Sequence, residues 1–280
     1  MADPLHIRVT HAGAVGLLTI DRLARFNSLD VSTARELRKA GLQLARDEAV
    51  RCLVVRGTGG LFCSGVDLKY VRAGGDPADL GYLSPEARGP QPGHGPIFKQ
   101  ILEYLHATIS ELRRAPKPVI AAVDGVAAAG GFGLAMCCDL VLASDRSSFE
   151  YAYFKTGLSG AESSTFFLPK LVGLRRAMEL ALLNPRLGAS EAQELGLVSR
   201  VLPTASFDDE VLALATRLAA GPTASYAAAK RLMNEAAGVD RLDFHLDREL
   251  EALVRSADSR DFAEGLAAFF EKRPPSFEGR

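Results

Sequence analysis

The sequence predicts an α/β fold, in which the strands of a parallel sheet alternate with helices, followed by a helical C-terminal region. Three observations predict this class. Short apolar runs alternate with longer segments that carry apolar residues at helical spacing. Two glycine-rich turns each follow an apolar run and lead into a helical segment. From Arg175 onward the sequence is rich in Ala and Leu, which is typical of helices.

The predicted strands are short and almost entirely apolar. The runs VGLLTI (15–20), CLVVRG (52–57) and VIAAV (119–123) have the continuous apolar character of strands that are buried on both faces. The run DLVLAS (139–144) predicts a further strand, and a short one is expected near 198–202. The strands are therefore expected to stop near Ser144 apart from this short one, and the helical C-terminal region to begin between about 195 and 205.

Helices are predicted between these strands. Segment 31–47 carries apolar or small residues on one helical face, with Asp30 or Ser32 as the N-cap. Segment 97–113 has the same pattern and is ended by the two prolines of the sequence APKPV. The intervening residues 73–96 are crowded with Gly and Pro and are predicted to form a loop.

The composition excludes several classes of protein. The 280 residues are 48% hydrophobic and 24% charged, which is typical of a globular chain. With 33 basic and 34 acidic residues the net charge is −1, which disfavours nucleic-acid binding. Four cysteines without CxxC spacing, and no metal-ligand spacing, predict reduced buried thiols and no metal site. We expect a cytoplasmic protein without membrane contact, because neither a secretory signal nor an apolar stretch of spanning length is evident.

The two glycine-rich turns carry the functional signal. They are FCSGVDL (62–68) and GVAAAGGFGLAM (125–136), and each joins a predicted strand to a helix. If their free backbone N–H groups converge, they can form an oxyanion hole. The alternative is that both are ordinary strand–helix connectors. A dinucleotide fingerprint is excluded because the third glycine of GxGxxG is absent, and neither a Walker sequence nor a GxSxG elbow occurs.

The two turns resemble the signature segments of the enoyl-CoA hydratase/isomerase (crotonase) superfamily. The resemblance extends over nearly the whole chain, through ARFNSL, LVVRGTGGLFCSGVDL, KPVIAAVDGVAAAGGFGLAMCCDLVLAS, LPKLVGLRRAMELAL, ASEAQELGLVSRVLP and AEGLAAFFEKRPPSF. It implies a crotonase-like spiral of ββα turns over 1–200 and a C-terminal helical trimerisation region over 201–280. It also implies an acyl-CoA thioester substrate, of which coenzyme A is a part, no separate cofactor, and a homotrimer or a dimer of trimers.

The resemblance places the two oxyanion donors at the amides of Val66 and Gly130. The residues that it assigns to coenzyme A fall into two groups. Those at the nucleotide end are Ala24, Arg25 and Phe26, and those near the pantetheine channel are Ser64, Asp67 and Leu68. Lys272 resembles a terminal lysine that reaches the CoA phosphates, often across a subunit boundary; the alternative is an exposed lysine of the tail.

The chain departs from the family's hydratases at both catalytic glutamates, because Gly133 and Tyr153 stand at those positions. Isomerases and hydrolytic relatives place a carboxylate further on, which an ungapped alignment puts at Ala161. The adjacent Glu162 is the best candidate carboxylate, although one residue turns a helical side chain by about 100 degrees. The alternative is a capping acid in the first turn of a helix.

His106 matches a water-activating histidine of the family's aryl-CoA dehalogenases, and its alternative is a packed core histidine. One carboxylate and an oxyanion hole suffice to shift a double bond, so an isomerase-like enzyme for fatty, aryl or alicyclic enoyl-CoA is favoured over two-glutamate hydration. The alternatives are a hydrolytic or dehalogenase-like enzyme using Glu162 and His106, and a non-catalytic acyl-CoA-binding subunit.

Overall fold

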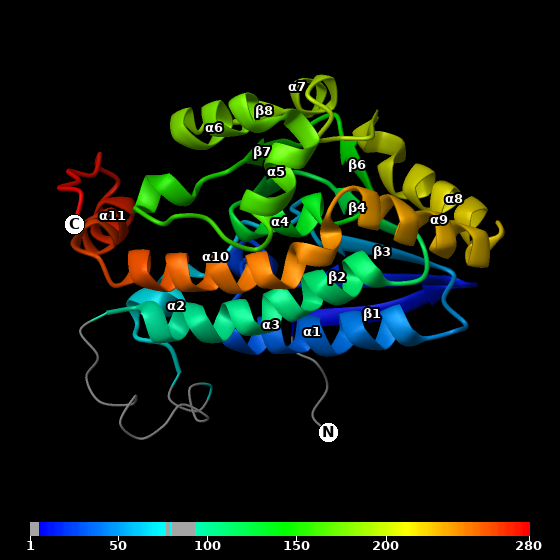
Figure 1. Cartoon of the computed structure of the whole chain (residues 1–280), viewed down its shortest axis with the longest axis horizontal. Helices are drawn as coiled ribbons and strands as arrows, with labels where there is room; N and C mark the ends of the chain where they lie inside the picture. Colours follow the sequence, from blue (N-terminus) through cyan, green and yellow to red (C-terminus); the bar gives the residue numbers. More distant parts are fainter. Residues whose placement is uncertain (1–5, 77–78, 80–92) are drawn as a thin grey trace.

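The strands form two sheets in a computed structural model that describes residues 6–76, 79 and 93–280 (Figure 1). The strands of the larger sheet, in spatial order, are β1 (Ile7–Ala12), β2 (Val15–Ile20), β3 (Cys52–Gly57), β4 (Val119–Val123), β6 (Leu140–Ser144) and β9 (Arg200–Leu202). The smaller sheet contains β5 (Val126–Ala128), β7 (Ser148–Glu150) and β8 (Leu187–Gly188). In the larger sheet β1 pairs antiparallel with β2 and all other neighbours are parallel.

Helices follow most of the strands and make up nearly all of the C-terminal part. They are α1 (Val31–Arg46), α2 (Leu68–Arg72), α3 (Gly95–Arg114), α4 (Gly130–Met136), α5 (Ser164–Val172), α6 (Leu174–Leu183), α7 (Ala189–Glu194), α8 (Phe207–Ala219), α9 (Thr223–Ala236), α10 (Leu242–Ala257) and α11 (Arg260–Glu271). The α/β class is confirmed. No helix of the described segments is both long and apolar enough to cross a membrane.

The predicted central strands are confirmed, and the larger sheet to which they belong is covered on both faces. In β3, Leu53 and Val55 belong to the main core beneath α1 and α3, whereas Cys52 and Val54 belong to a second core covered by α8. A strand buried on both sides has no polar face, which explains the continuous apolar run. All four cysteines are buried and free, as predicted.

The predicted helices are confirmed with small shifts at their ends. Asp30 is the N-cap of α1, and its carboxylate accepts a hydrogen bond from the Thr33 amide at 2.8 Å. Helix α3 begins two residues before the predicted start, at Gly95, whose amide donates to the Asp258 carboxylate at 2.7 Å. Most of the predicted loop over 73–96 lies outside the described residues.

Four strands, β1, β5, β7 and β8, were not predicted. Strand β1 was missed at the N-terminal edge, and the glycine-rich turn around 125–131 contains β5 before it enters α4. Strand β7 pairs parallel with β5, so these short strands form a second sheet beside the turn. Figure 1 shows α10 lying alongside α3, so a helix of the C-terminal region packs directly on the N-terminal core.

Candidate active site

A cavity of about 510 Å³ collects most of the residues that the sequence singles out. It opens beside the two glycine-rich turns and is lined mainly by apolar groups. The predicted site residues on its wall are Ala24, Arg25, Phe26, Ser64, Val66, Asp67, Leu68, Gly130 and Glu162. His106 and Lys272 do not line it.

Hydrogen bonds on both sides of the first turn fix the backbone around Val66. The Leu29 amide donates to the Gly65 carbonyl oxygen at 2.8 Å, and the Asp67 amide donates to the Leu29 carbonyl oxygen at 2.9 Å. These two bonds form a short parallel bridge between Leu29 and Val66. The amide of Val66 donates no hydrogen bond to any acceptor in the described residues.

The second turn lies directly against the first. The Cys63 amide donates to the Val126 carbonyl oxygen at 3.0 Å, and the Ala128 amide donates to the Cys63 carbonyl oxygen at 3.1 Å. Gly65 has φ +89°, and a Cβ atom on it would lie only 3.1 Å from the Gly130 nitrogen. The Gly130 amide is likewise without an acceptor in the part of the chain described. Two unpaired N–H donors therefore stand on one cavity wall.

Glu162 reaches this wall from a left-handed turn that precedes α5. Glu162 has φ +50° and Ser163 has φ +64°, so neither residue belongs to the helix. The Glu162 side chain lies beside Gly130, because a Cβ atom on Gly130 would be 3.0 Å from Glu162 Oε1. In a regular helix the Glu162 side chain would point about 100 degrees away from the direction of residue 161. Glu162 lies in a left-handed turn before the helix instead, and its side chain points to Gly130.

The Glu162 carboxyl group is buried, with 1% of the residue exposed. Burial raises its pKa to about 8, although a hydrogen bond from the Tyr153 hydroxyl opposes the increase. That hydroxyl lies 2.5 Å from Glu162 Oε2 and 2.9 Å from the Ala161 carbonyl oxygen. A carboxyl group with this pKa exchanges protons readily near neutral pH.

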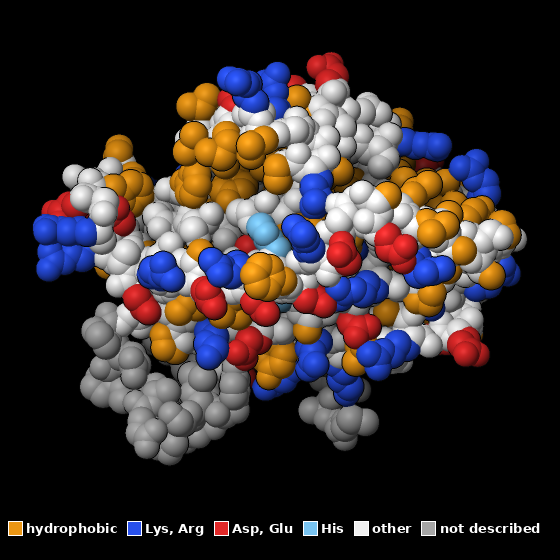
Figure 2. Space-filling model, viewed as in Figure 1, with side chains coloured by type: hydrophobic (Ala, Val, Ile, Leu, Met, Phe, Trp, Pro, Cys, Tyr) orange, Lys and Arg blue, Asp and Glu red, His pale blue; other side chains and the backbone are white. Residues whose placement is uncertain are grey.

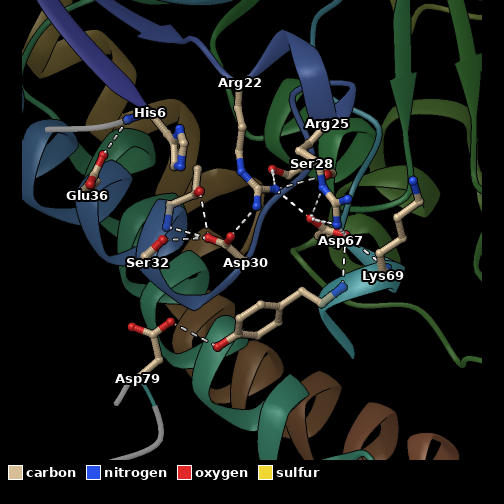
Figure 3. Close-up of polar contacts among 12 residues, drawn as sticks. His6, Arg22, Arg25, Ser28, Asp30, Ser32, Glu36, Asp67, Lys69 and Asp79 are labelled. Atoms are coloured by element: carbon tan, nitrogen blue, oxygen red, sulfur yellow. Dashed lines mark hydrogen bonds and ion pairs between the residues drawn. The ribbon is translucent and has the colours of Figure 1, made fainter. Parts of the chain in front are cut away.

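Two other carboxylates line the cavity, and both are neutralised by cations. Figure 3 shows Asp67 between Arg22 and Arg25, whose guanidinium groups donate to it at 2.7 and 2.6 Å. Burial alone would raise the pKa of Asp67, but the hydrogen bonds from Arg25 and Arg22 hold it below its usual value. Glu150 forms ion pairs with Lys155 and, at 3.7 Å, with Arg186.

His106 lies behind the cavity rather than in it. It is 7% exposed, and its Nε2 atom accepts the backbone N–H of Glu162 at 3.2 Å. Burial lowers the pKa of His106 to about 3. The position on α3 was predicted to suit a water-activating base, but this nitrogen already has a donor and does not face the cavity.

Lys272 is exposed and follows the last residue of α11, with φ +55°. It does not reach the cavity of its own chain. This placement is compatible with an exposed lysine of the tail and with a contact to coenzyme A across a subunit boundary, so both alternatives stay predictions.

The sequence analysis missed or undervalued several residues of the site. Tyr153 was noted for standing at a hydratase glutamate position, whereas its hydroxyl contacts Glu162. Glu249 of α10 was not considered; its carboxylate accepts the Ser163 amide at 2.8 Å. Arg22 was also missed. It forms ion pairs with Asp30 and Asp67, and these two acidic residues are the feature of the sequence that could have pointed to it.

Comparison with known proteins supplies the family. The family model described as enoyl-CoA hydratase/isomerase matches residues 10–86 and 97–280. The chain belongs to the enoyl-CoA hydratase/isomerase family. Its fold is crotonase-like, as predicted, and it is an acyl-CoA enzyme of this family.

The relatives in this family carry different reactions in their names. A 1,2-epoxyphenylacetyl-CoA isomerase of Escherichia coli is 35% identical over 94% of both chains. A 4-chlorobenzoyl coenzyme A dehalogenase of Arthrobacter is 34% identical over 95% of this chain and 91% of the relative. Among solved structures, an enoyl-CoA hydratase of Mycobacterium avium subsp. paratuberculosis has a TM-score of 0.83 at 31% identity, covering 98% of each chain.

The structure gives a physical reason for glycine at position 133 in this family member. A Cβ atom on Gly133 would lie 2.0 Å from the Glu162 carbonyl oxygen. No side chain fits there while the turn at Glu162 keeps its present course. A glutamate at position 133, as in the family's hydratases, is therefore incompatible with the observed placement of Glu162.

Proposed function

We propose that this enzyme moves a double bond within an enoyl-CoA thioester, with Glu162 as the single proton-transferring group. The observation that carries the proposal is the contrast among the three cavity carboxylates. Asp67 and Glu150 are paired with arginine or lysine, whereas Glu162 has no cation partner within the described residues and its pKa is raised to about 8. Glu162 also lies beside Gly130, whose amide is free to bind a thioester oxygen.

In the proposed reaction the thioester carbonyl oxygen accepts hydrogen bonds from the amides of Val66 and Gly130. These donors stabilise the negative charge that develops when ionised Glu162 removes a proton from the α-carbon of a 3-enoyl thioester. The C–H electron pair enters the conjugated dienolate. Protonated Glu162 then returns the proton to the γ-carbon, which yields the 2-enoyl thioester and restores the carboxylate.

The cavity wall supports an apolar acyl group. It is lined by Leu68, Phe98, Leu158, Leu253 and Phe270. Apart from Glu162 and Lys69, the charged side chains on the wall belong to the ion pairs at Asp67 and Glu150. A fatty, aryl or alicyclic acyl chain suits such a lining. In this proposal coenzyme A is part of the substrate, and no separate cofactor takes part.

The deciding experiment is Glu162→Gln assayed with 3-enoyl-CoA substrates by the ultraviolet absorbance of the conjugated product. We expect kcat to fall by about 100- to 10,000-fold, the usual contribution of a general acid–base group. Binding of the CoA thioester, measured by calorimetry, should be retained because the amide is isosteric. Unchanged turnover would remove Glu162 from the mechanism.

A dehalogenase-like or hydrolytic reaction is the second candidate, and the 34% identity to the Arthrobacter dehalogenase favours it. Glu162 would then attack the halogen-bearing ring carbon of an aryl-CoA and form an aryl ester with release of halide, and water would hydrolyse this ester and restore the carboxylate. The position of His106 opposes this candidate, because its Nε2 atom accepts the Glu162 amide and does not face the cavity. Turnover in ¹⁸O-labelled water distinguishes the two, since only hydrolysis places solvent oxygen in the product. Thioester binding without any turnover would indicate a non-catalytic subunit.

We also propose that the chain assembles with copies of itself, as a trimer or a pair of trimers. Figure 2 shows hydrophobic side chains gathered over α6. Leu174, Met178 and Leu182 recur every four residues on this helix and are at least half exposed. Such an apolar stripe is typical of a contact surface. Sedimentation equilibrium tests this assembly. The cytoplasmic location of the protein stays a prediction.

A further inference from the structure

The turn that carries Glu162 is an unusual piece of backbone. Glu162 and Ser163 are consecutive left-handed residues, and neither is glycine. Left-handed backbone is unfavourable for residues with a Cβ atom and persists where surrounding contacts determine it. Several of the contacts that hold this turn come from two helices far away in the sequence.

Three backbone donors around this turn find acceptors on α3 or α10, while the Ser164 amide donates to the Ala161 carbonyl oxygen at 3.0 Å. The Glu162 amide donates to His106 Nε2 at 3.2 Å. The Ser163 and Thr165 amides donate to the Glu249 carboxylate at 2.8 and 2.9 Å, and the Thr165 hydroxyl also donates to it. Since α5 begins at Ser164, the Glu249 carboxylate also lies at the positive end of this helix.

We propose that His106 and Glu249 are positioning residues, which hold the left-handed turn and thereby keep the Glu162 carboxyl group beside Gly130. This inference rests on the proposed role of Glu162. His106 acts here as a hydrogen-bond acceptor for the backbone and takes no part in activating water.

The burial of the pair supports this role. His106 is 7% exposed and Glu249 is 4% exposed, and neither lines the cavity. His106 accepts the Glu162 amide only with its Nε2 atom unprotonated, and burial, which lowers its pKa to about 3, keeps the ring neutral. A proton on Nε2 would instead favour Glu249 Oε2, 3.8 Å away, and break the bond to Glu162. The other ionisable groups near Glu249 are His245, at 3.8 Å, and Tyr151 and Glu162.

The test compares His106→Leu with His106→Gln. Leucine fills the space but leaves the Glu162 amide without an acceptor, whereas the glutamine side chain can offer an oxygen near the position of Nε2. For His106→Leu we expect kcat to fall by about 10- to 100-fold with KM nearly unchanged, the usual cost of one buried unsatisfied donor. His106→Gln should recover most of the loss. Thr108→Val is the matched control on the same buried helix face, because its hydroxyl bonds only within α3.

Hydrogen exchange followed by mass spectrometry supplies a readout that does not depend on activity. In His106→Leu, and to a lesser degree in Glu249→Gln, peptides that cover residues 158–167 should exchange faster, while those of the larger sheet stay protected. Equal kcat for His106→Leu, His106→Gln and the parent, or unchanged exchange in this segment, would overturn the inference.

A double variant separates this inference from the proposed function. If His106 acts through Glu162, adding His106→Leu to Glu162→Gln should cause little further loss of kcat. A full additional loss would mean that His106 acts independently, which contradicts the positioning role. If Glu162→Gln alone is fully active, the proposed function fails, and the exchange measurement still decides whether His106 holds the turn.

Discussion

Removal of the Tyr153 hydroxyl group should change the pH at which the enzyme becomes active. This hydroxyl lies 2.5 Å from Glu162 Oε2 and stabilises the ionised form of the carboxyl group. A hydrogen bond to a charged group contributes about 1.5–3 kcal/mol, which corresponds to about one to two pH units. Tyr153→Phe therefore raises the pKa of Glu162 further above the value of about 8 that burial produces.

The assay is the pH dependence of kcat/KM for a 3-enoyl thioester between pH 6 and 10. The free enzyme needs ionised Glu162 as the base, so the rate should rise with pH through an inflection near pH 8. In Tyr153→Phe the inflection should lie about one to two pH units higher, and at pH 7 the rate should be about 10- to 100-fold lower. The difference in rate between the two enzymes should shrink at alkaline pH, where Glu162 is ionised in both.

Tyr151→Phe is the matched control. The Tyr151 ring packs against Tyr153 with centroids 4.9 Å apart, but its hydroxyl donates to the Ser159 carbonyl oxygen rather than to Glu162. Its inflection should stay near that of the parent enzyme. An inflection that moves to lower pH in Tyr153→Phe, or that does not move at all, would refute the assignment of Glu162 as the base.

Two further predictions concern the same wall of the cavity. In Gly130→Ala the new Cβ atom would lie 3.0 Å from Glu162 Oε1, so the Glu162 carboxyl group would have to move away from the Gly130 amide. We expect kcat to fall by about 100- to 1000-fold, as large as the effect of removing one oxyanion donor. Steady-state kinetics that show retained activity would contradict this. Glu162→Gln should be more stable than the parent, because the folded pKa of about 8 exceeds the usual 4.5 and folding is therefore weakened as pH rises between these values. Urea unfolding should show a gain on the order of a few kcal/mol at pH 9 and a smaller one at pH 6, and a gain independent of pH would contradict the raised pKa.

The sequence predicted well what depends on local pattern. The buried strands were recognised because two-sided burial leaves an unbroken apolar run, as in β3. Both glycine turns were recognised because a strand, a sharp turn and a helix follow one another within a few residues. Strand β5 was not predicted because its three residues, Val126–Ala128, are too few to show the alternation of a strand and lie inside the glycine-rich segment.

What the sequence could not predict depends on contacts between distant residues. The direction of Glu162 is determined by acceptors on His106, 56 residues away, and the next residue is held by Glu249, 86 residues further on. No local pattern contains these distances. Similarly, the sequence did not predict that the Asp67 carboxylate caps α2 and pairs with two arginines, and the coenzyme contact that the resemblance assigned to Asp67 stays a prediction.

Tyrosine at position 153 and the carboxylate at position 162 are coupled by electrostatics. A glutamate at 153 would place a second buried carboxyl group next to Glu162, and two neighbouring carboxylates in a dry site oppose each other's ionisation. Tyrosine avoids this repulsion because its hydroxyl remains neutral, with a pKa well above the ordinary value owing to burial. The same hydroxyl lies 2.9 Å from the Ala161 carbonyl oxygen, to which its single proton can turn when the Glu162 carboxyl group is protonated. Tyrosine at position 153 therefore suits a site with one buried carboxylate, because its hydroxyl favours the ionised form of Glu162.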